Sequence, residues 1–200
     1  MNSFFLQFTD AHAHLPKSPA EDEHITVPAG KRILLNAVSE DDFPRVAALA
    51  KKFPGLIIPA FGIHPWGSDS WTSETSAVLR HYLSSIPFAT VGEIGLDRCR
   101  GDRRVQEIAF REQLELAVEF RLPVSLHVVR AFGKTEEILR PFFFAGTLPP
   151  FLLHAYGGSP EQAKVFARFG GVFSASRKTL PSECRLVPES DKPLGDGYGN

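Results

Sequence analysis

Four histidines and two carboxylates in this 200-residue chain stand at or near the ends of short apolar runs. They are His12, His14, Glu93, His127, His154 and Asp191. His12 and His14 are two residues apart, so on an extended chain their imidazoles point to the same side and can converge on one ion. Six such groups suit two divalent ions (Zn²⁺, Mn²⁺ or Mg²⁺) that share a bridging carboxylate.

The apolar runs have the composition of strands that are buried on both faces, since most are rich in Val, Ile, Leu or Phe. We predict eight strands, at residues 4–8, 32–37, 56–61, 88–94, 123–129, 151–154, 171–175 and 185–187. The eighth is expected to end at Asp191. Apolar spacing predicts a helix over 106–121 and another over 160–169, in which Ser159 and Gln162 form a capping box.

Strands that alternate with helices indicate crossover units and a parallel sheet. Eight strands predict an α/β fold, a TIM-type (β/α) barrel, whose active site lies at the carboxyl ends of the strands. A typical barrel of this kind takes about 250 residues, so several outer helices are expected to be reduced or missing. Residues 15–31, which include three prolines, are predicted to form a loop. The chain 1–200 is interpreted as a single domain.

Composition and charge narrow the class of protein. A hydrophobic content of 43% can support one sizeable core, and the net charge of −1 does not by itself indicate a membrane or nucleic-acid partner. The start of the chain has no signal-peptide pattern, and Cys99 and Cys184 form no disulfide or zinc motif. We therefore expect a cytoplasmic protein, either a monomer or a weak homo-oligomer.

Five motifs, in order from residue 10 to residue 191, resemble the TatD family of metal-dependent hydrolases. They are Asp10-Ala-His-Ala-His14, Gly62-Ile-His-Pro65, Gly92-Glu-Ile-Gly-Leu-Asp97, Pro123-Val-Ser-Leu-His127 and Glu189-Ser-Asp191. The resemblance implies a metal-dependent barrel of the amidohydrolase type with deoxyribonuclease activity on phosphodiester bonds.

The same resemblance implies a role for each ligand. His12, His14, Glu93 and Asp191 would hold one ion, and Glu93 would bridge it to a second ion. The second ion would also bind the two remaining histidines, His127 and His154. Asp191 would help to activate the attacking water.

The sequence departs from the family pattern at positions that bear on the substrate. Val129 stands where the family usually has arginine, and Arg130 follows it. Arg98 stands where an aromatic residue is usual, and Pro188 replaces an apolar strand residue. The chain also ends soon after Asp191, whereas family members usually continue.

Several other residues are candidates for substrate contacts. His64 follows the third predicted strand, where it would orient a phosphate or the leaving group, unless it is a structural histidine of the rim. Arg98, Arg130 and Lys178 are predicted to hold substrate phosphates, although they could equally form part of a mixed solvated rim. Trp66 could stack on a base or pack back onto the domain.

The function that we predict is metal-dependent cleavage of a phosphoester bond, with DNA ends or short nucleotides as substrate. The first alternative is hydrolysis of an amide or lactone ring on the same scaffold. The second is a degenerate metal-binding scaffold that acts through a partner. Fold and ligand types do not decide among these three.

Overall fold

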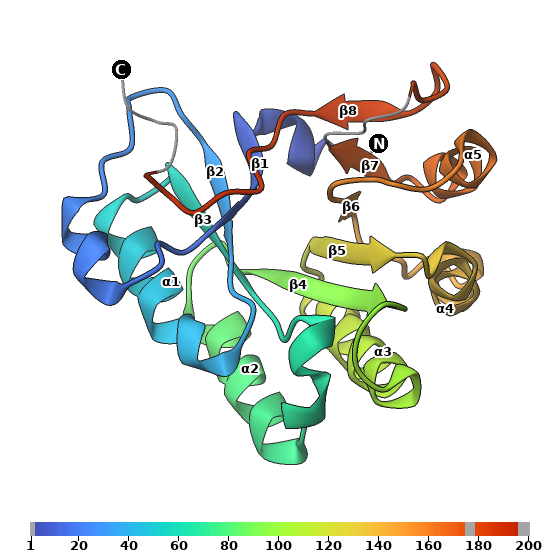
Figure 1. The fold of residues 1–200 in the computed structure, drawn as a ribbon, viewed down its shortest axis with the longest axis horizontal. Coiled ribbons are helices and arrows are strands. Elements are labelled where there is room, and N and C mark those ends of the chain that lie inside the picture. The colour runs from blue at the N-terminus through green and yellow to red at the C-terminus, as the bar shows by residue number, and fades with distance from the viewer. Residues whose placement is uncertain (1–2, 175–178, 196–200) are drawn as a thin grey trace.

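The computed structural model describes residues 3–174 and 179–195, and its strands form one eight-stranded parallel sheet. Neighbours in the sheet follow the chain order (Figure 1). The strands are β1 (Asp10–His14), β2 (Ile33–Asn36), β3 (Ile57–Phe61), β4 (Thr90–Asp97), β5 (Val124–Val129), β6 (Phe151–Leu153), β7 (Val172–Ser174) and β8 (Arg185–Val187). This arrangement confirms the predicted α/β barrel.

The segment that follows β8 closes the barrel against β1. The Ala11 N–H donates to the Pro188 carbonyl (2.8 Å), and the Asp191 N–H donates to the His12 carbonyl (3.0 Å). We call the pairing of residues 188–194 with β1 the seam. It covers the open edges of the sheet, whose backbone groups would otherwise lack partners.

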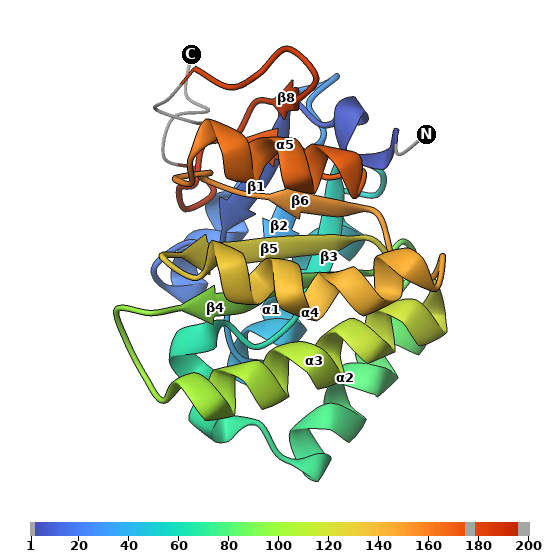
Figure 2. The ribbon, with the colours of Figure 1, turned by 90° about the vertical axis from the view of Figure 1, so that its right-hand side faces the viewer.

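Five α-helices follow β2 to β6 in turn. They are α1 (Phe43–Lys52), α2 (Ser73–Ser85), α3 (Arg103–Phe120), α4 (Phe132–Phe144) and α5 (Pro160–Arg168). Figure 2 shows α3, α4 and α5 side by side over the outer face of the strands. The β1–β2 connection has only a short 3-10 helix, η2 (Pro19–His24), and the described part of the β7–β8 connection has no helix. The expected loss of outer helices is therefore confirmed at these two places. Among the described helices, none is both long and apolar enough to cross a membrane.

The two helices predicted from periodicity are present, with the expected cap on α5. Ser159 accepts from the backbone N–H of Gln162, whose side chain reaches back to the Ser159 N–H. Helix α3 begins at Arg103, three residues before the predicted start. There, Asp102 accepts from the first free amides of the helix.

Two predicted strand positions are wrong. Residues 4–8 form a 3-10 helix, η1 (Phe4–Gln7), because three phenylalanine rings pack on one another there instead of alternating across a sheet. The eighth strand ends at Val187, so Asp191 lies four residues beyond it, on the seam. Strand β4 extends to Asp97, which places Glu93 within the strand.

Inward-facing residues form an apolar floor below a polar layer. Phe5 and Phe8, near η1, pack with inward residues such as Leu152 and Val172 in a buried cluster separate from the larger core under the helices. His154 comes two residues after Leu152, and Ser174 comes two residues after Val172. Because the strand period is two, they face the same side as those residues. The barrel thus presents its chemical groups above a closed hydrophobic base.

Candidate metal centre

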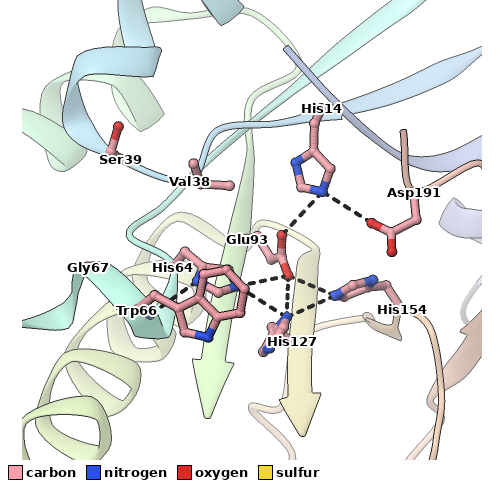
Figure 3. Close-up of a pocket in the computed structure, with 10 residues that line it drawn as sticks. All are labelled: His14, Val38, Ser39, His64, Trp66, Gly67, Glu93, His127, His154 and Asp191. Carbon is pink, nitrogen blue, oxygen red and sulfur yellow. Dashed lines mark hydrogen bonds and ion pairs between the residues drawn. The ribbon is translucent and has the colours of Figure 1, made fainter. Parts of the chain in front are cut away.

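All six predicted ligands converge at the carboxyl-end mouth of the barrel. Strand β1 carries His12 and His14, β4 carries Glu93, β5 carries His127, and His154 directly follows β6. Asp191 comes from the seam. Figure 3 shows the Glu93 carboxylate between two sets of side chains, which approach it from opposite sides.

One side of the cluster lies around the Oε2 atom of Glu93. His12 Nε2 is 3.2 Å from this oxygen and His14 Nε2 is 3.8 Å from it. The Oδ1 atom of Asp191 lies 3.2 Å from His14 Nε2 and 3.9 Å from His12 Nε2. Ligand atoms that share one ion at about 2.0–2.2 Å are roughly 3–4 Å apart, so these four groups fit one ion.

The other side of the cluster lies around the Oε1 atom of Glu93. His127 Nδ1 and His154 Nε2 are each 2.7 Å from this oxygen, and they are 3.2 Å from each other. A small outward movement of these rings would place an ion among them. The Oε2 atom of Glu93 thus faces His12 and His14, while Oε1 faces His127 and His154, with His64 also 3.5 Å away.

Neighbouring charges and burial shift the pKa values of this cluster in opposite directions. Burial alone would raise the pKa of the Glu93 carboxyl, but His154 and His12 hold that pKa well below its usual value. Burial lowers the pKa of His12 to about 3. Against the effect of burial, Glu93 raises the pKa of His154 to about 9. A buried carboxylate surrounded by imidazoles is costly without a cation.

An unsatisfied atom also fits a metal. His12 is fully buried, and its Nδ1 lies 3.0 Å from the hydroxyl of Ser125. Its Nε2 faces Glu93 and has no hydrogen-bond partner among the described residues. If Nδ1 carries the proton, Nε2 presents a bare lone pair to the cluster, as a metal ligand does. The residues present therefore fit divalent ions.

His64 belongs to the same cluster, but its hydrogen bonds favour a different role. Its Nε2 is 3.5 Å from Glu93 Oε1, close enough to share an ion with Glu93 and His127. However, its Nδ1 accepts the backbone N–H of Trp66 (3.1 Å). Burial lowers the pKa of His64, which favours the neutral ring. A neutral ring that accepts at Nδ1 carries its proton on Nε2, so His64 presents a donor to the pocket.

A cavity of about 480 Å³ opens over the cluster. It is lined by His14, Val38, Ser39, His64, Trp66, Gly67, Glu93, His127, His154 and Asp191. The predicted phosphate-binding residues Arg98 and Arg130 are exposed and do not line it. They lie beside each other, since the Arg98 N–H donates to the Val129 carbonyl (3.0 Å). Lys178 lies outside the described residues, so its predicted role has no structural counterpart here.

Sequence reasoning missed several side chains that support the ligands. Ser125 contacts His12, and Asp97 Oδ2 lies 3.4 Å from His127 Nε2. Glu189 accepts from the Ala155 N–H and from the Ser174 hydroxyl, beside His154. Two of these side chains could have been predicted from the sequence. Ser125 is one strand period before His127, and Asp97 is the last residue of the motif Gly92-Glu-Ile-Gly-Leu-Asp97.

Close strand contact at Gly95 also serves the site. A Cβ atom at this position would overlap the carbonyl of His127 on the neighbouring strand. Glycine therefore lets β4 approach β5 closely where Glu93 and His127 must meet. This explains in physical terms why a glycine follows so soon after the central carboxylate.

A parallel eight-stranded barrel with histidines and carboxylates at the carboxyl ends of its strands defines a (β/α)-barrel protein with a candidate two-metal site. Comparison with known proteins then gives the family. The chain belongs to the TatD related DNase family, whose model matches residues 9–193. The predicted resemblance is confirmed.

Individual relatives agree with the family assignment. The chain is 32% identical over 135 residues to the 3'-5' ssDNA/RNA exonuclease TatD of Erwinia billingiae, covering 66% of this chain and 51% of that protein. The enzyme of the same name from Dickeya dadantii is 29% identical, with 80% of this chain and 66% of that protein covered. The chain thus spans about half of the first relative's length.

Solved structures confirm the fold. YJJV, a TatD homologue from Escherichia coli K12, superposes with a TM-score of 0.73 at 28% identity, covering 86% of this chain and 68% of that one. An uncharacterized amidohydrolase from Saccharomyces cerevisiae gives a TM-score of 0.63 at 16% identity, with 94% and 72% covered. This second likeness concerns the fold alone, so it does not support the predicted amide-hydrolysis alternative.

Proposed function

We propose that this chain carries the active site of a two-metal phosphodiesterase that acts on the ends of nucleic-acid strands or on short nucleotides. The observation that carries this proposal is that the two oxygens of Glu93 face different sets of histidines, His12 and His14 at Oε2, and His127 and His154 with His64 at Oε1. The names of the relatives, exonucleases on single-stranded DNA and RNA, support the same substrate class.

In this proposal, His12, His14 and Asp191 would hold one divalent ion, His127 and His154 would hold the other, and Glu93 would contribute to both. Such ions polarise a phosphoryl oxygen and lower the pKa of water. The chain's own residues then position the substrate and move protons. The Asp191 side chain, 44% exposed at the rim, accepts a proton from the attacking water.

His64 acts on the opposite side of the pocket. Its Nε2–H points toward Glu93 and into the cavity, so it can donate to a phosphoryl oxygen or to the leaving oxygen. Because burial lowers the pKa of this ring, the neutral donor form persists at neutral pH. This matches the predicted substrate role of His64 without making it a ligand.

The size of the cavity favours a short substrate. A volume of about 480 Å³ lies within the usual range for small-molecule sites, about 300–1,000 Å³, and could hold the end of a strand. We propose that Arg98 and Arg130 hold a phosphate just outside it. We further propose that residues 1–200 form one cytoplasmic domain that is monomeric or weakly self-associating.

The test is turnover on labelled single-stranded oligonucleotides and on amide and lactone substrates, with Mg²⁺, Mn²⁺ or Zn²⁺ supplied separately. We expect stepwise loss of nucleotides from strand ends in the presence of metal. Turnover of only the amide or lactone substrates would establish the first alternative. Stoichiometric metal binding without any turnover would instead leave the scaffold alternative.

A further inference from the structure

Asp97 is a buried carboxylate that the proposed chemistry does not use. It is the last residue of β4 and is only 3% exposed. Its Oδ1 accepts the Cys99 N–H (2.7 Å), while its Oδ2 accepts the indole N–H of Trp66 (2.6 Å) and lies 3.4 Å from His127 Nε2. Donors from three separate segments therefore converge on one side chain.

The contact with Asp97 helps to orient the His127 ring. His127 Nε2 faces Asp97, and Nδ1, on the other edge of the ring, lies 2.7 Å from Glu93 Oε1. Asp97 thus holds the ring with Nδ1 toward the metal centre. Histidine ligands commonly donate their other N–H to a carboxylate, which fixes both the tautomer and the ring orientation.

The contact with Trp66 determines the shape of the pocket wall. Trp66 is 51% exposed and lines the cavity, so packing alone does not hold its ring. The hydrogen bond to Asp97 anchors one edge of the indole, and the Arg100 guanidinium lies over it, 4.1 Å from the ring centroid. Figure 3 shows this ring in front of His64, whose Nδ1 accepts the Trp66 backbone N–H.

We propose that Asp97 is a positioning residue that holds the ligand His127 and the pocket wall Trp66 in one geometry. One carboxylate would then couple metal affinity on the Oε1 side of Glu93 to substrate binding beside His64. The metal part of this inference rests on the proposed function, whereas the hydrogen bond of Trp66 to Asp97 is a property of the protein without metal.

The first test combines Mn²⁺ titration with the indole N–H resonance of Trp66, measured by NMR in the metal-free protein. In Asp97→Asn we expect this resonance to shift, because the indole loses its charged acceptor. Mn²⁺ titration of the same variant should show one ion bound about 10–100-fold more weakly. Asp69→Asn is the matched control, because it removes an exposed carboxylate near the same segment and should change neither measurement.

Trp66→Phe tests the contact of Asp97 with Trp66 apart from its contact with His127, since it removes the indole N–H and leaves Asp97 beside His127. We expect the KM for a short oligothymidine to rise severalfold, while the Mn²⁺ dissociation constants stay as in the wild type. Loss of metal in Trp66→Phe would mean that the contacts of Asp97 with His127 and with Trp66 do not act independently. This result would overturn the proposed arrangement.

Two further outcomes count against the proposal. Asp97→Asn with an unchanged Trp66 resonance and unchanged Mn²⁺ affinity would overturn it. So would a Trp66 indole N–H that exchanges with water in the wild type as fast as a free indole, and this measurement decides even if Asp97→Asn fails to fold. If the wild type neither binds Mn²⁺ nor cleaves the oligonucleotide, the proposed function fails, while the Trp66 resonance still decides the role of Asp97.

Discussion

The two sides of the candidate metal centre differ in how much of their side chains is exposed, although His12, on the seam side, is fully buried. On the Oε1 side of Glu93, His127 stands within β5 and His154 follows β6, and their side chains are only 12% and 6% exposed. We call this region the wall. On the seam side, His14 and Asp191 are 27% and 44% exposed, and Asp191 lies beyond a strand of three residues.

This difference follows from the outer layer of the barrel. Helices α3 to α5 cover the strands of the wall (Figure 2), whereas the described parts of the connections next to the seam carry no α-helix. Asp191 has φ +52°, and aspartate tolerates this left-handed backbone better than most residues do. A two-metal centre can thus combine one firmly held ion with one that exchanges more easily.

The largest effect is expected at the carboxylate that both regions share. Glu93→Ala should lose both ions and lower turnover by more than about 1,000-fold, because transition-state charge stabilisation by metals is lost. His12→Ala should lose only one ion. Elemental analysis of the purified variants measures this, with the exposed Glu115→Ala as control. Two ions retained in Glu93→Ala would contradict a bridging role.

A second expectation concerns the seam directly. Wild-type protein should bind Mn²⁺ in two steps whose dissociation constants differ by more than about tenfold, because ligands on exposed segments lose more conformational freedom when they bind. Asp191→Asn should weaken only the weaker step, by a further factor of about ten or more. Calorimetric titration reports both steps. Equal weakening of both steps would remove the distinction between the seam and the wall.

His64 should affect turnover without affecting metal. His64→Ala is expected to reduce kcat by about 100-fold, within the usual range for a lost proton donor, while two ions are retained. The melting temperature should fall slightly, because the bond to the Trp66 N–H is lost. His64→Gln restores an N–H donor and should recover part of the rate. If His64→Ala instead binds one ion fewer, His64 is a ligand and its proton is not on Nε2.

The smallest effect is expected at the rim of the wall. Wild-type kcat/KM on single strands should depend weakly on salt, with a log–log slope no steeper than about −2, since only two or three phosphates are held at roughly −0.7 each. Arg98→Ala and Arg130→Ala should each reduce the slope by about 0.7, whereas Lys51→Ala on α1 should not. A slope near −5, or gains that continue with strand length, would indicate an extended groove.

The sequence by itself indicated the six candidate ligands and most of the elements that carry them. Ligand chemistry and strand period depend on residue type and local spacing, so they could be read without coordinates. The same is true of the Ser159 cap of α5. The prediction of a strand from the local pattern was wrong at residues 4–8. This apolar run forms the 3-10 helix η1, because its rings pack into the floor of the barrel.

Only the tertiary structure determined which atoms of these groups contact one another. The division of the Glu93 oxygens, the tautomer of His64 and the three donors around Asp97 depend on distances between residues that are far apart in the chain. Barrel closure at the seam likewise joins residue 11 to residue 188. No local periodicity encodes such contacts, because they arise only when strand curvature and packing bring the two ends of the sheet together.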